Sequence, residues 1–228
     1  MDTLRTSHHI CYINIMANYK TLDSWSIKAQ KEGYPARSVY KLQEIGEKFS
    51  LFHTLQGKKA QVNEGAAFKV LDLGCAPGSW SVYVLRKLKN NVFLAACDLS
   101  DLTNDSVKAD FANSKAFFLK GDMEDAQNHA ILCSKGPYNL VLCDAAPSTT
   151  GNRNIDTARS ISLAEMSLHY AETALVKGGA WVTKIFQGSN TSDFLKTAAA
   201  KFKKFQTFKP KACRTNSFEI YAIGLGKI

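Results

Sequence analysis

Residues 70–80 read VLDLGCAPGSW, an apolar run that ends in Asp72 and leads into a loop of small residues. Glycine lets a backbone turn tightly and approach a ligand without a Cβ in the way. Open α/β sheets bind ligands at the carboxyl ends of their strands, where such a loop would lie. The pattern predicts a strand, a turn and a helix around a cofactor, although a purely structural turn has the same form.

The spacing within this loop decides which cofactor it fits. A dinucleotide fingerprint needs glycines where Ala76 and Ser79 stand. A phosphate-binding P-loop needs a following Gly-Lys-Ser/Thr, and Pro77 removes one of the backbone donors that a phosphate would use. S-adenosylmethionine fits better, because it has no phosphate and needs acidic partners for its ribose and adenine.

Three carboxylates follow three successive apolar runs: Asp98, Asp122 and Asp144. Asp98 stands twenty residues after Gly78, near the position of a ribose-binding acid in nucleotide-type half-sheets. A single acid after a strand is more often a helix cap or a turn former. Three acids at the ends of three successive strands predict that their side chains converge on one crevice.

Two further charged residues lie inside apolar runs, Lys184 in AWVTKIF and Glu219 in NSFEIYAIG. A strand buried on both faces should carry an aliphatic residue at such a position, and burying an unpaired ammonium is costly. Each residue therefore needs a partner or a chemical role. A structural ion pair between Lys184 and Glu219 is the alternative to a catalytic function.

The elements that must position these residues alternate along the chain. Apolar runs predict strands at 68–73, 92–97, 116–120, 138–143, 180–186 and 218–224. Helical spacing predicts helices that begin at Pro35 and that cover 79–89, 124–134, 157–177 and 191–205. Such alternation is typical of a mostly parallel sheet with helices on both faces. Polar residues 57–67 are expected to form a loop, and residues 148–156 a mobile substrate lid.

Composition indicates one domain with a nucleic-acid partner. The 228 residues carry a net charge of +9, and residues 28–59 and 196–227 are both rich in lysine and arginine. Such basic segments attract phosphate groups, although a soluble basic protein without that function has the same charge.

Several classes of site are not expected. The six cysteines and five histidines show no metal-ligand spacing, so we predict reduced, mostly buried cysteines and no metal. No run approaches the length of a membrane span, and the N-terminus does not read as a secretory signal. We expect a cytoplasmic protein with a tail over residues 1–24, in which either Met1 or Met16 is the true start.

At these residues the chain resembles the FtsJ/RrmJ family of S-adenosylmethionine-dependent RNA ribose 2′-O-methyltransferases. The resemblance runs from about Trp25 to the C-terminus. Seven segments in family order carry it: ARSVYKL, VLDLGCAPGSWS, ACDLS, GDMED, CDAAPSTTG, VTKIFQG and SFEIYAIG. It implies one Rossmann-like class I methyltransferase domain over 25–228, with a mostly parallel sheet, helices on both faces and an antiparallel strand near the C-terminus.

The resemblance also implies the site residues. The catalytic tetrad is Lys41, Asp144, Lys184 and Glu219. The cofactor contacts are Gly78, Trp80, Asp98, Asp122 and Asp144. Ser79 replaces the second glycine of many bacterial members, but relatives with the same APGSW retain the family pattern, so we expect cofactor binding to be unaffected.

Methyl transfer to a hydroxyl needs a group that removes the hydroxyl proton. We assign Lys184 as that base and Asp144 as the residue that orients it. Lys41 and Glu219 are expected to position the hydroxyl and Lys184. A lysine acts as a base only when neutral, which burial and a neighbouring cation favour.

Within the resemblance, bacterial members methylate a uridine ribose in large-subunit (23S-type) rRNA, while relatives act on tRNA anticodon loops or mRNA caps. The KIFQG segment and the compact chain favour the rRNA type, whereas EGYPARS also resembles tRNA-type members. A 2′-hydroxyl exists in RNA and not in DNA. We expect a monomer acting on rRNA. A small-molecule methyltransferase and a non-catalytic RNA-binding assembly factor are the alternatives from other classes.

Overall fold

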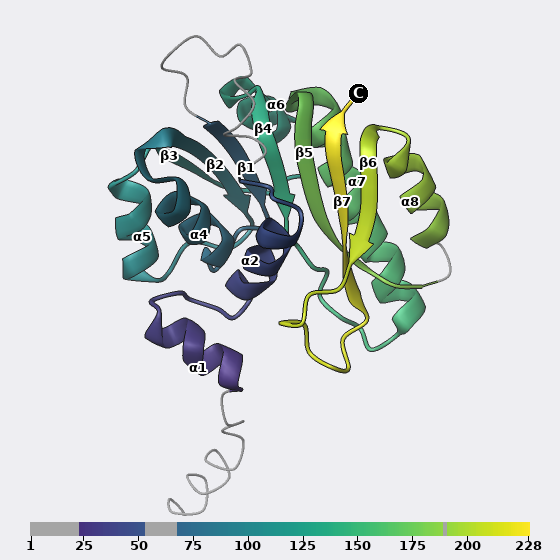
Figure 1. Cartoon of the computed structure of the whole chain (residues 1–228), viewed down its shortest axis with the longest axis horizontal. Helices are drawn as coiled ribbons and strands as arrows, with labels where there is room; N and C mark the ends of the chain where they lie inside the picture. Colours follow the sequence, from purple (N-terminus) through teal and green to yellow (C-terminus); the bar gives the residue numbers. More distant parts are fainter. Residues whose placement is uncertain (1–22, 53–67, 189–190) are drawn as a thin grey trace, which may run out of the picture.

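A seven-stranded mixed sheet runs through the computed structural model, which describes residues 23–52, 68–188 and 191–228 (Figure 1). The strands lie in the order β3-β2-β1-β4-β5-β7-β6. Strands β1 to β5 pair in parallel, and β7 runs antiparallel to both β5 and β6. Their bounds are β1 Phe68–Leu73, β2 Val92–Asp98, β3 Ala116–Lys120, β4 Tyr138–Cys143, β5 Leu175–Phe186, β6 Phe202–Phe208 and β7 Glu219–Lys227. The predicted mostly parallel sheet with an antiparallel strand near the C-terminus is confirmed.

Helices cover both faces of this sheet (Figure 1). Their bounds are α1 Ser24–Lys31, α2 Val39–Lys48, α4 Ser79–Leu88, α5 Asp105–Ala112, α6 Ala126–Lys135, α7 Arg153–Ala174 and α8 Thr191–Ala199. Because side chains alternate along a strand, Val70 packs with α2 and α4 while Leu71 packs with α7. The predicted covering of both faces is therefore also confirmed.

The helices differ from the prediction in two ways: two begin at other residues, and two short ones were not predicted. The helix expected from Pro35 begins at Val39, and the one expected at 157 begins at Arg153, because the Asn152 side chain caps it. The second half of the predicted lid, 153–156, is thus the first turn of α7. Helices α1 and α5 were not predicted, since each is eight residues long and buries a single residue, Ala29 or Val107.

The largest error concerns residues 191–205, which were expected to form one helix. Helix α8 ends at Ala199, and Phe202 begins the edge strand β6. Phe202 keeps the helical spacing of the preceding apolar residues, which explains the prediction. In the structure its ring stacks on Trp181 at 5.7 Å, while Lys203 and Lys204 face solvent. Exposed lysines are typical of edge strands, where they discourage pairing with other chains.

The carboxyl ends of β1 to β5 lie at one edge of the sheet. The start of α7 and the loop between β6 and β7 lie at that same end (Figure 1). None of the helices that the structure describes has the length and apolarity needed to cross a membrane. The predictions for the N-terminal tail and the loop 57–67 concern residues almost entirely outside the described part of the chain.

Candidate active site

Two buried ion pairs lie where β4 and β5 end. Lys184 Nζ is 3.1 Å from Asp144 Oδ1, and it also donates to the Asp144 backbone carbonyl. Lys41 Nζ is 2.6 Å from Glu219 Oε1. The four side chains are between 8% and 16% exposed. The structure thus brings the four residues of the predicted tetrad into two close pairs.

The alternative pairing, a structural bridge between Lys184 and Glu219, was wrong. Among the ion pairs of residues 23–52, 68–188 and 191–228, Lys184 joins Asp144 and Glu219 joins Lys41. The reason is the position of α2, which brings a second lysine to Glu219. Sequence order could not show this, because Lys41 and Glu219 are far apart in the chain.

Tyr221 links the two ion pairs, and the sequence interpretation missed it. Its hydroxyl donates to Asp144 Oδ1 at 2.7 Å, and Lys41 Nζ lies 5.9 Å from the centre of its ring. The ring also lies beside Trp80, with 5.7 Å between ring centres. Tyr221 stands two residues after Glu219 in β7, so the period of a strand places both on one face. This two-residue spacing from Glu219 could have identified Tyr221 from the sequence.

The register of the sheet aligns these side chains. Lys184 in β5 lies opposite Tyr221 in β7, and Phe186 lies opposite Glu219. Directly opposed residues of an antiparallel pair project from the same face of the sheet. Lys184, Tyr221 and Glu219 therefore reach the same side without any loop having to adjust.

Helix α2 is fastened to the loop between β6 and β7. The Glu44 carboxylate accepts the backbone N–H groups of Lys211 and Ala212, both at 2.8 Å. Arg37 donates to the Ala212 carbonyl at 2.6 Å. These contacts fix the position of α2, and with it the position of the Lys41 ammonium group relative to β7.

The surroundings favour a charged Lys41. Burial alone would lower the pKa of Lys41, but the carboxylates of Asp144 and Glu219 outweigh it and raise that pKa above its usual value. Burial and the neighbouring Glu219 raise the pKa of the Cys213 thiol to about 12, so this thiol stays protonated. Because its own pKa is raised, Lys41 is a fixed positive charge at neutral pH and not a proton acceptor.

The predicted cofactor loop follows β1 with two glycines in the left-handed region. Gly74 has φ +67°, and an added Cβ would lie 2.5 Å from the Ala145 side chain. Gly78 has φ +106°, and its Cβ would lie 2.6 Å from Val107. Only glycine fits both the backbone conformation and the space at these positions. The tight turn that the sequence predicted is confirmed.

Two predicted cofactor-binding carboxylates lie at the carboxyl ends of β2 and β3. Asp98 accepts the N–H of Ala76 at 2.9 Å and that of Ser100 at 2.7 Å, which ties it to the glycine turn. Asp122 is exposed and accepts the N–H of Glu124 at 2.9 Å. Both side chains lie at the expected edge of the sheet, and their contact with a cofactor stays a prediction.

Trp80, the remaining predicted cofactor residue, is 2% exposed. Its indole N–H donates to the Ser38 carbonyl at 2.9 Å, and this hydrogen bond joins α4 to the start of α2. The side chain therefore has a clear packing role between the cofactor loop and the helix that carries Lys41. A contact between Trp80 and a cofactor remains a prediction.

Asp72 and Leu99 were given no role from the sequence. Asp72 is fully buried at the end of β1, where it accepts the Ser81 hydroxyl hydrogen at 2.6 Å. Its Oδ1 has no hydrogen-bond partner within the described residues. Burial raises the pKa of Asp72 to about 7. Leu99, directly after Asp98, is 68% exposed.

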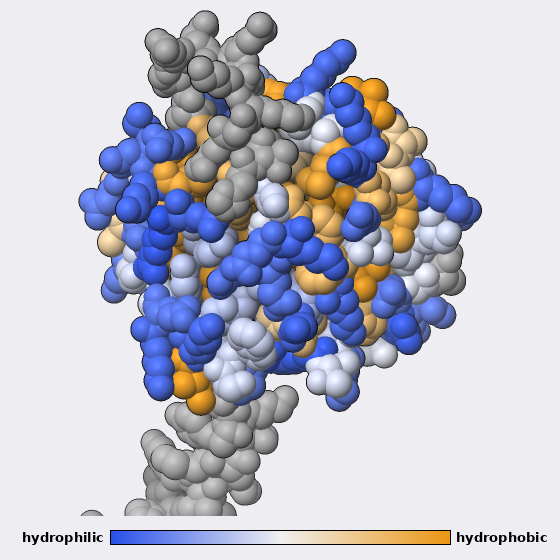
Figure 2. All heavy atoms as spheres, in the orientation of Figure 1, coloured by the Kyte–Doolittle hydropathy of each residue, from blue (hydrophilic) through white to orange (hydrophobic). Residues whose placement is uncertain are grey.

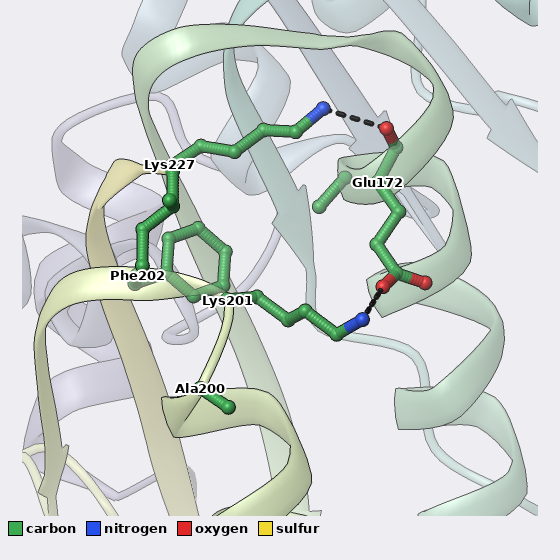
Figure 3. A pocket seen from close by; sticks show the side chains of 7 residues that line it. Glu172, Ala200, Lys201, Phe202 and Lys227 are labelled. Atoms are coloured by element: carbon green, nitrogen blue, oxygen red, sulfur yellow. Dashed lines mark hydrogen bonds and ion pairs between the residues drawn. The ribbon is translucent and has the colours of Figure 1, made fainter.

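A separate cavity lies at the opposite edge of the sheet, between α7 and the ends of β6 and β7 (Figure 3). Lys201 pairs with Glu172 at 2.5 Å, and Lys227 donates to the Glu172 and Leu175 carbonyls at 2.6 and 2.8 Å. Both ammonium groups therefore hold strands to α7. Within the described residues, no cluster of histidine, cysteine or carboxylate side chains is arranged to hold a metal ion.

The sheet order, the glycine turn after β1 and the acids at the strand ends define an α/β enzyme of the methyltransferase class. Residues 34–227 match the FtsJ-like methyltransferase family, and the chain belongs to this family. The resemblance noted in the sequence is thereby confirmed.

Similar proteins agree with this membership. A protein from Treponema denticola named Ribosomal RNA large subunit methyltransferase E is 48% identical over 207 residues, which cover 91% of this chain and 96% of the relative. A protein of the same name from Borrelia garinii subsp. bavariensis is 40% identical, over 90% of this chain and 97% of its own. A Plasmodium falciparum structure named as a ribosomal RNA methyltransferase shares the fold, with a TM-score of 0.67, 24% identity, and coverage of 85% and 98%.

Proposed function

We propose that this enzyme transfers a methyl group from S-adenosylmethionine to a ribose 2′-hydroxyl of large-subunit ribosomal RNA. Similarity to relatives of that name over nine-tenths of the chain supports the substrate class. The observation that carries the reaction is the geometry of Lys184, whose Nζ contacts both the carboxylate and the carbonyl of Asp144.

The residues of the glycine loop fit S-adenosylmethionine. Asp98, Asp122 and Asp144 lie at the carboxyl ends of parallel strands, and their negative charge suits a cationic cofactor. The same charge would repel the pyrophosphate of a dinucleotide. We assign Gly78, Asp98, Asp122 and Asp144, with Trp80, to cofactor binding. The chemistry that S-adenosylmethionine supplies when bound is an electrophilic methyl group.

Lys184 is assigned as the general base. A neutral lysine amine has two N–H donors and one lone pair. Asp144 offers two acceptors to Nζ, its Oδ1 and its carbonyl oxygen. When both N–H groups are held there, the lone pair occupies the remaining direction and can accept the proton of the ribose hydroxyl. The resulting ammonium is stabilised by the Asp144 carboxylate until the proton passes to solvent.

Lys41 and Glu219 are assigned as positioning residues. The charged Lys41 ammonium has three donors, of which Glu219 takes one at 2.6 Å. The others remain for oxygen atoms of the ribose or its phosphate.

Positive charge beside the site supports an RNA substrate. Lys209, Lys211 and Arg214 are exposed on the loop that Glu44 fastens to α2. Hydrophilic side chains, acidic and basic alike, also spread over the face on which α2 and α4 lie (Figure 2). Phosphate contacts of this kind provide affinity without sequence preference and weaken with salt.

The experiment that tests this function measures methyl transfer from labelled S-adenosylmethionine to large ribosomal subunits and tRNA from cells that lack the protein. We expect a single 2′-O-methylated ribose in large-subunit rRNA, and none with the Lys184→Ala variant. Methylation of tRNA alone would contradict the proposed substrate. Equal inactivity of wild type and variant on both substrates, with both proteins folded, would overturn the enzymatic assignment.

A further inference from the structure

An aromatic and arginine pair lies at the rim of the active site. The guanidinium carbon of Arg153 is 5.3 Å from the centre of the Phe218 ring. The ring of Phe218 packs edge to face on Phe186, with 4.7 Å between centres and 61° between planes. Phe186 is buried and Phe218 is half-buried. A rigid aromatic residue in the core therefore holds a second aromatic residue that still reaches the surface.

The position of this pair follows from the same strands that build the tetrad. Phe218 directly precedes Glu219, and Phe186 lies opposite Glu219 in the ladder between β5 and β7. Arg153 begins α7 and donates to the Gln187 carbonyl at 3.3 Å. The pair is thus adjacent to Glu219, which is assigned to position the ribose through Lys41.

Within the described residues, Arg153 forms no ion pair with a carboxylate. None of the ion pairs found among the described residues includes Arg153. By contrast, Arg37 pairs with Asp23, and Arg86 pairs with Asp110 at 2.8 Å. An exposed guanidinium over an aromatic ring has a planar surface and donors to offer a ligand.

We propose that Arg153 and Phe218 form a stacking subsite for an unpaired nucleobase of the RNA substrate. This inference rests on the proposed function, since a ribose positioned by Lys41 and Glu219 carries a base that lies nearby. Proteins that bind single-stranded RNA stack bases on aromatic side chains and on arginine planes. The subsite places such a base on the side of Glu219 away from α2.

A purely structural role makes a different prediction. If the pair only closes the end of the sheet, its loss lowers thermal stability and leaves the affinity for RNA unchanged. If it stacks a base, its loss weakens RNA binding and raises KM for RNA, while S-adenosylmethionine binding is retained. The Phe218→Leu variant separates the two, because leucine preserves apolar contact with Phe186 and removes the aromatic face.

The test uses the full chain with S-adenosylmethionine and two labelled probes, an oligouridylate and an RNA backbone of equal length without bases. For wild type we expect the bases to improve affinity. Phe218→Leu should lower affinity for oligouridylate by about 5- to 100-fold, as for one stacked base, and should bind the abasic probe like wild type. Phe218→Tyr, which keeps the stack, should retain wild-type affinity. Equal affinity of wild type and Phe218→Leu for oligouridylate would overturn the subsite.

Variants of Arg153 distinguish stacking from charge. Arg153→Lys keeps the charge and loses the plane, so we expect it to bind oligouridylate as weakly as Arg153→Ala. Full restoration by lysine would show simple attraction to phosphate and would contradict the stack. Arg159→Ala, another exposed arginine of α7, is the matched control and should bind like wild type. Failure of wild type to methylate ribosomal subunits would count against the proposed function, whereas the base dependence of binding tests the subsite alone.

Discussion

Tyr221 donates its hydroxyl hydrogen to Asp144 at 2.7 Å, and the oxygen that accepts it is the same Oδ1 that contacts Lys184. One carboxylate oxygen therefore orients two groups. Burial holds the pKa of Tyr221 well above its usual value, and the Asp144 charge raises it further, so the phenol remains a donor at neutral pH. We therefore propose that Tyr221 acts on the reaction by holding the Asp144 carboxylate in place.

We expect Tyr221→Phe to lower kcat by about tenfold or more, because it removes a hydrogen bond to a charged group that is worth about 1.5–3 kcal/mol. The ring that packs on Trp80 is retained, so the variant should fold, with a melting temperature lowered by several degrees for the lost hydrogen bond. Tyr138→Phe is the control, since the Tyr138 hydroxyl donates to the Leu132 carbonyl away from the tetrad. Kinetics of methyl transfer that are identical for wild type and Tyr221→Phe would contradict the role of the phenol.

Lys184→Met should reduce kcat by about 10²- to 10⁴-fold, the usual contribution of a positioned general base. Methionine has a similar length and removes the amine. Binding of S-adenosylmethionine, measured by calorimetry, should persist because the glycine turn is untouched. Lys227→Met removes a lysine that holds backbone carbonyls at the opposite edge, and it should remain active. If Lys184→Met keeps substantial activity, another group must act as the base and the assignment of Lys184 is wrong.

The sequence predicted the cofactor turn and the acids because these depend on local chain geometry. Gly74 and Gly78 are needed for backbone reasons that act within a few residues. Asp98 and Asp144 follow strands whose apolar character is visible in the sequence itself. A parallel sheet then brings strand ends together without further information.

The sequence did not predict features that depend on which distant elements touch. The Lys41–Glu219 pair exists because Glu44 and Arg37 fasten α2 to the loop before β7. Strand β6 was read as helix because Phe202 fits both the helical spacing before it and the strand that it begins. Pairing with β7 makes this segment a strand and not a continuation of the helix.

Gly74→Ala should lower stability and abolish cofactor binding, because an added Cβ would lie 2.7 Å from the Ala145 Cα, a backbone atom that cannot turn away. Gly151→Ala is the matched control. Gly151 also has a positive φ, +83°, but nothing lies within 4 Å of its added Cβ. It should therefore show only the backbone strain, about 1 kcal/mol. Equal melting temperatures of the two variants would show that the close approach at Gly74 has no consequence.

The buried carboxyl group of Asp72 should make the folding stability depend on pH. Its pKa is raised from 3.8 to about 7, chiefly by burial; the Ser81 hydrogen bond opposes this rise, and the nearby Asp144 and Asp98 carboxylates add to it. Below pH 3.8 the carboxyl is protonated in both the folded and the unfolded chain. As pH rises from there to about 7, the unfolded chain gains from ionisation that the folded chain resists, so folding stability falls.

Asp72→Asn removes this loss, because asparagine stays neutral and still offers an oxygen to the Ser81 hydroxyl. Without cofactor, the variant should gain stability relative to wild type as pH rises from 4 to 7, by on the order of 4 kcal/mol at 1.36 kcal/mol per pKa unit. The difference should level off above pH 7, where Asp72 is ionised in both states. Chemical denaturation at several pH values measures it, with Ser81→Ala as a variant in which the loss of wild-type stability should continue to higher pH, because the Ser81 hydrogen bond lowers the Asp72 pKa. A stability difference between Asp72→Asn and wild type that is constant from pH 4 to 8 would show that Asp72 ionises normally in the folded chain.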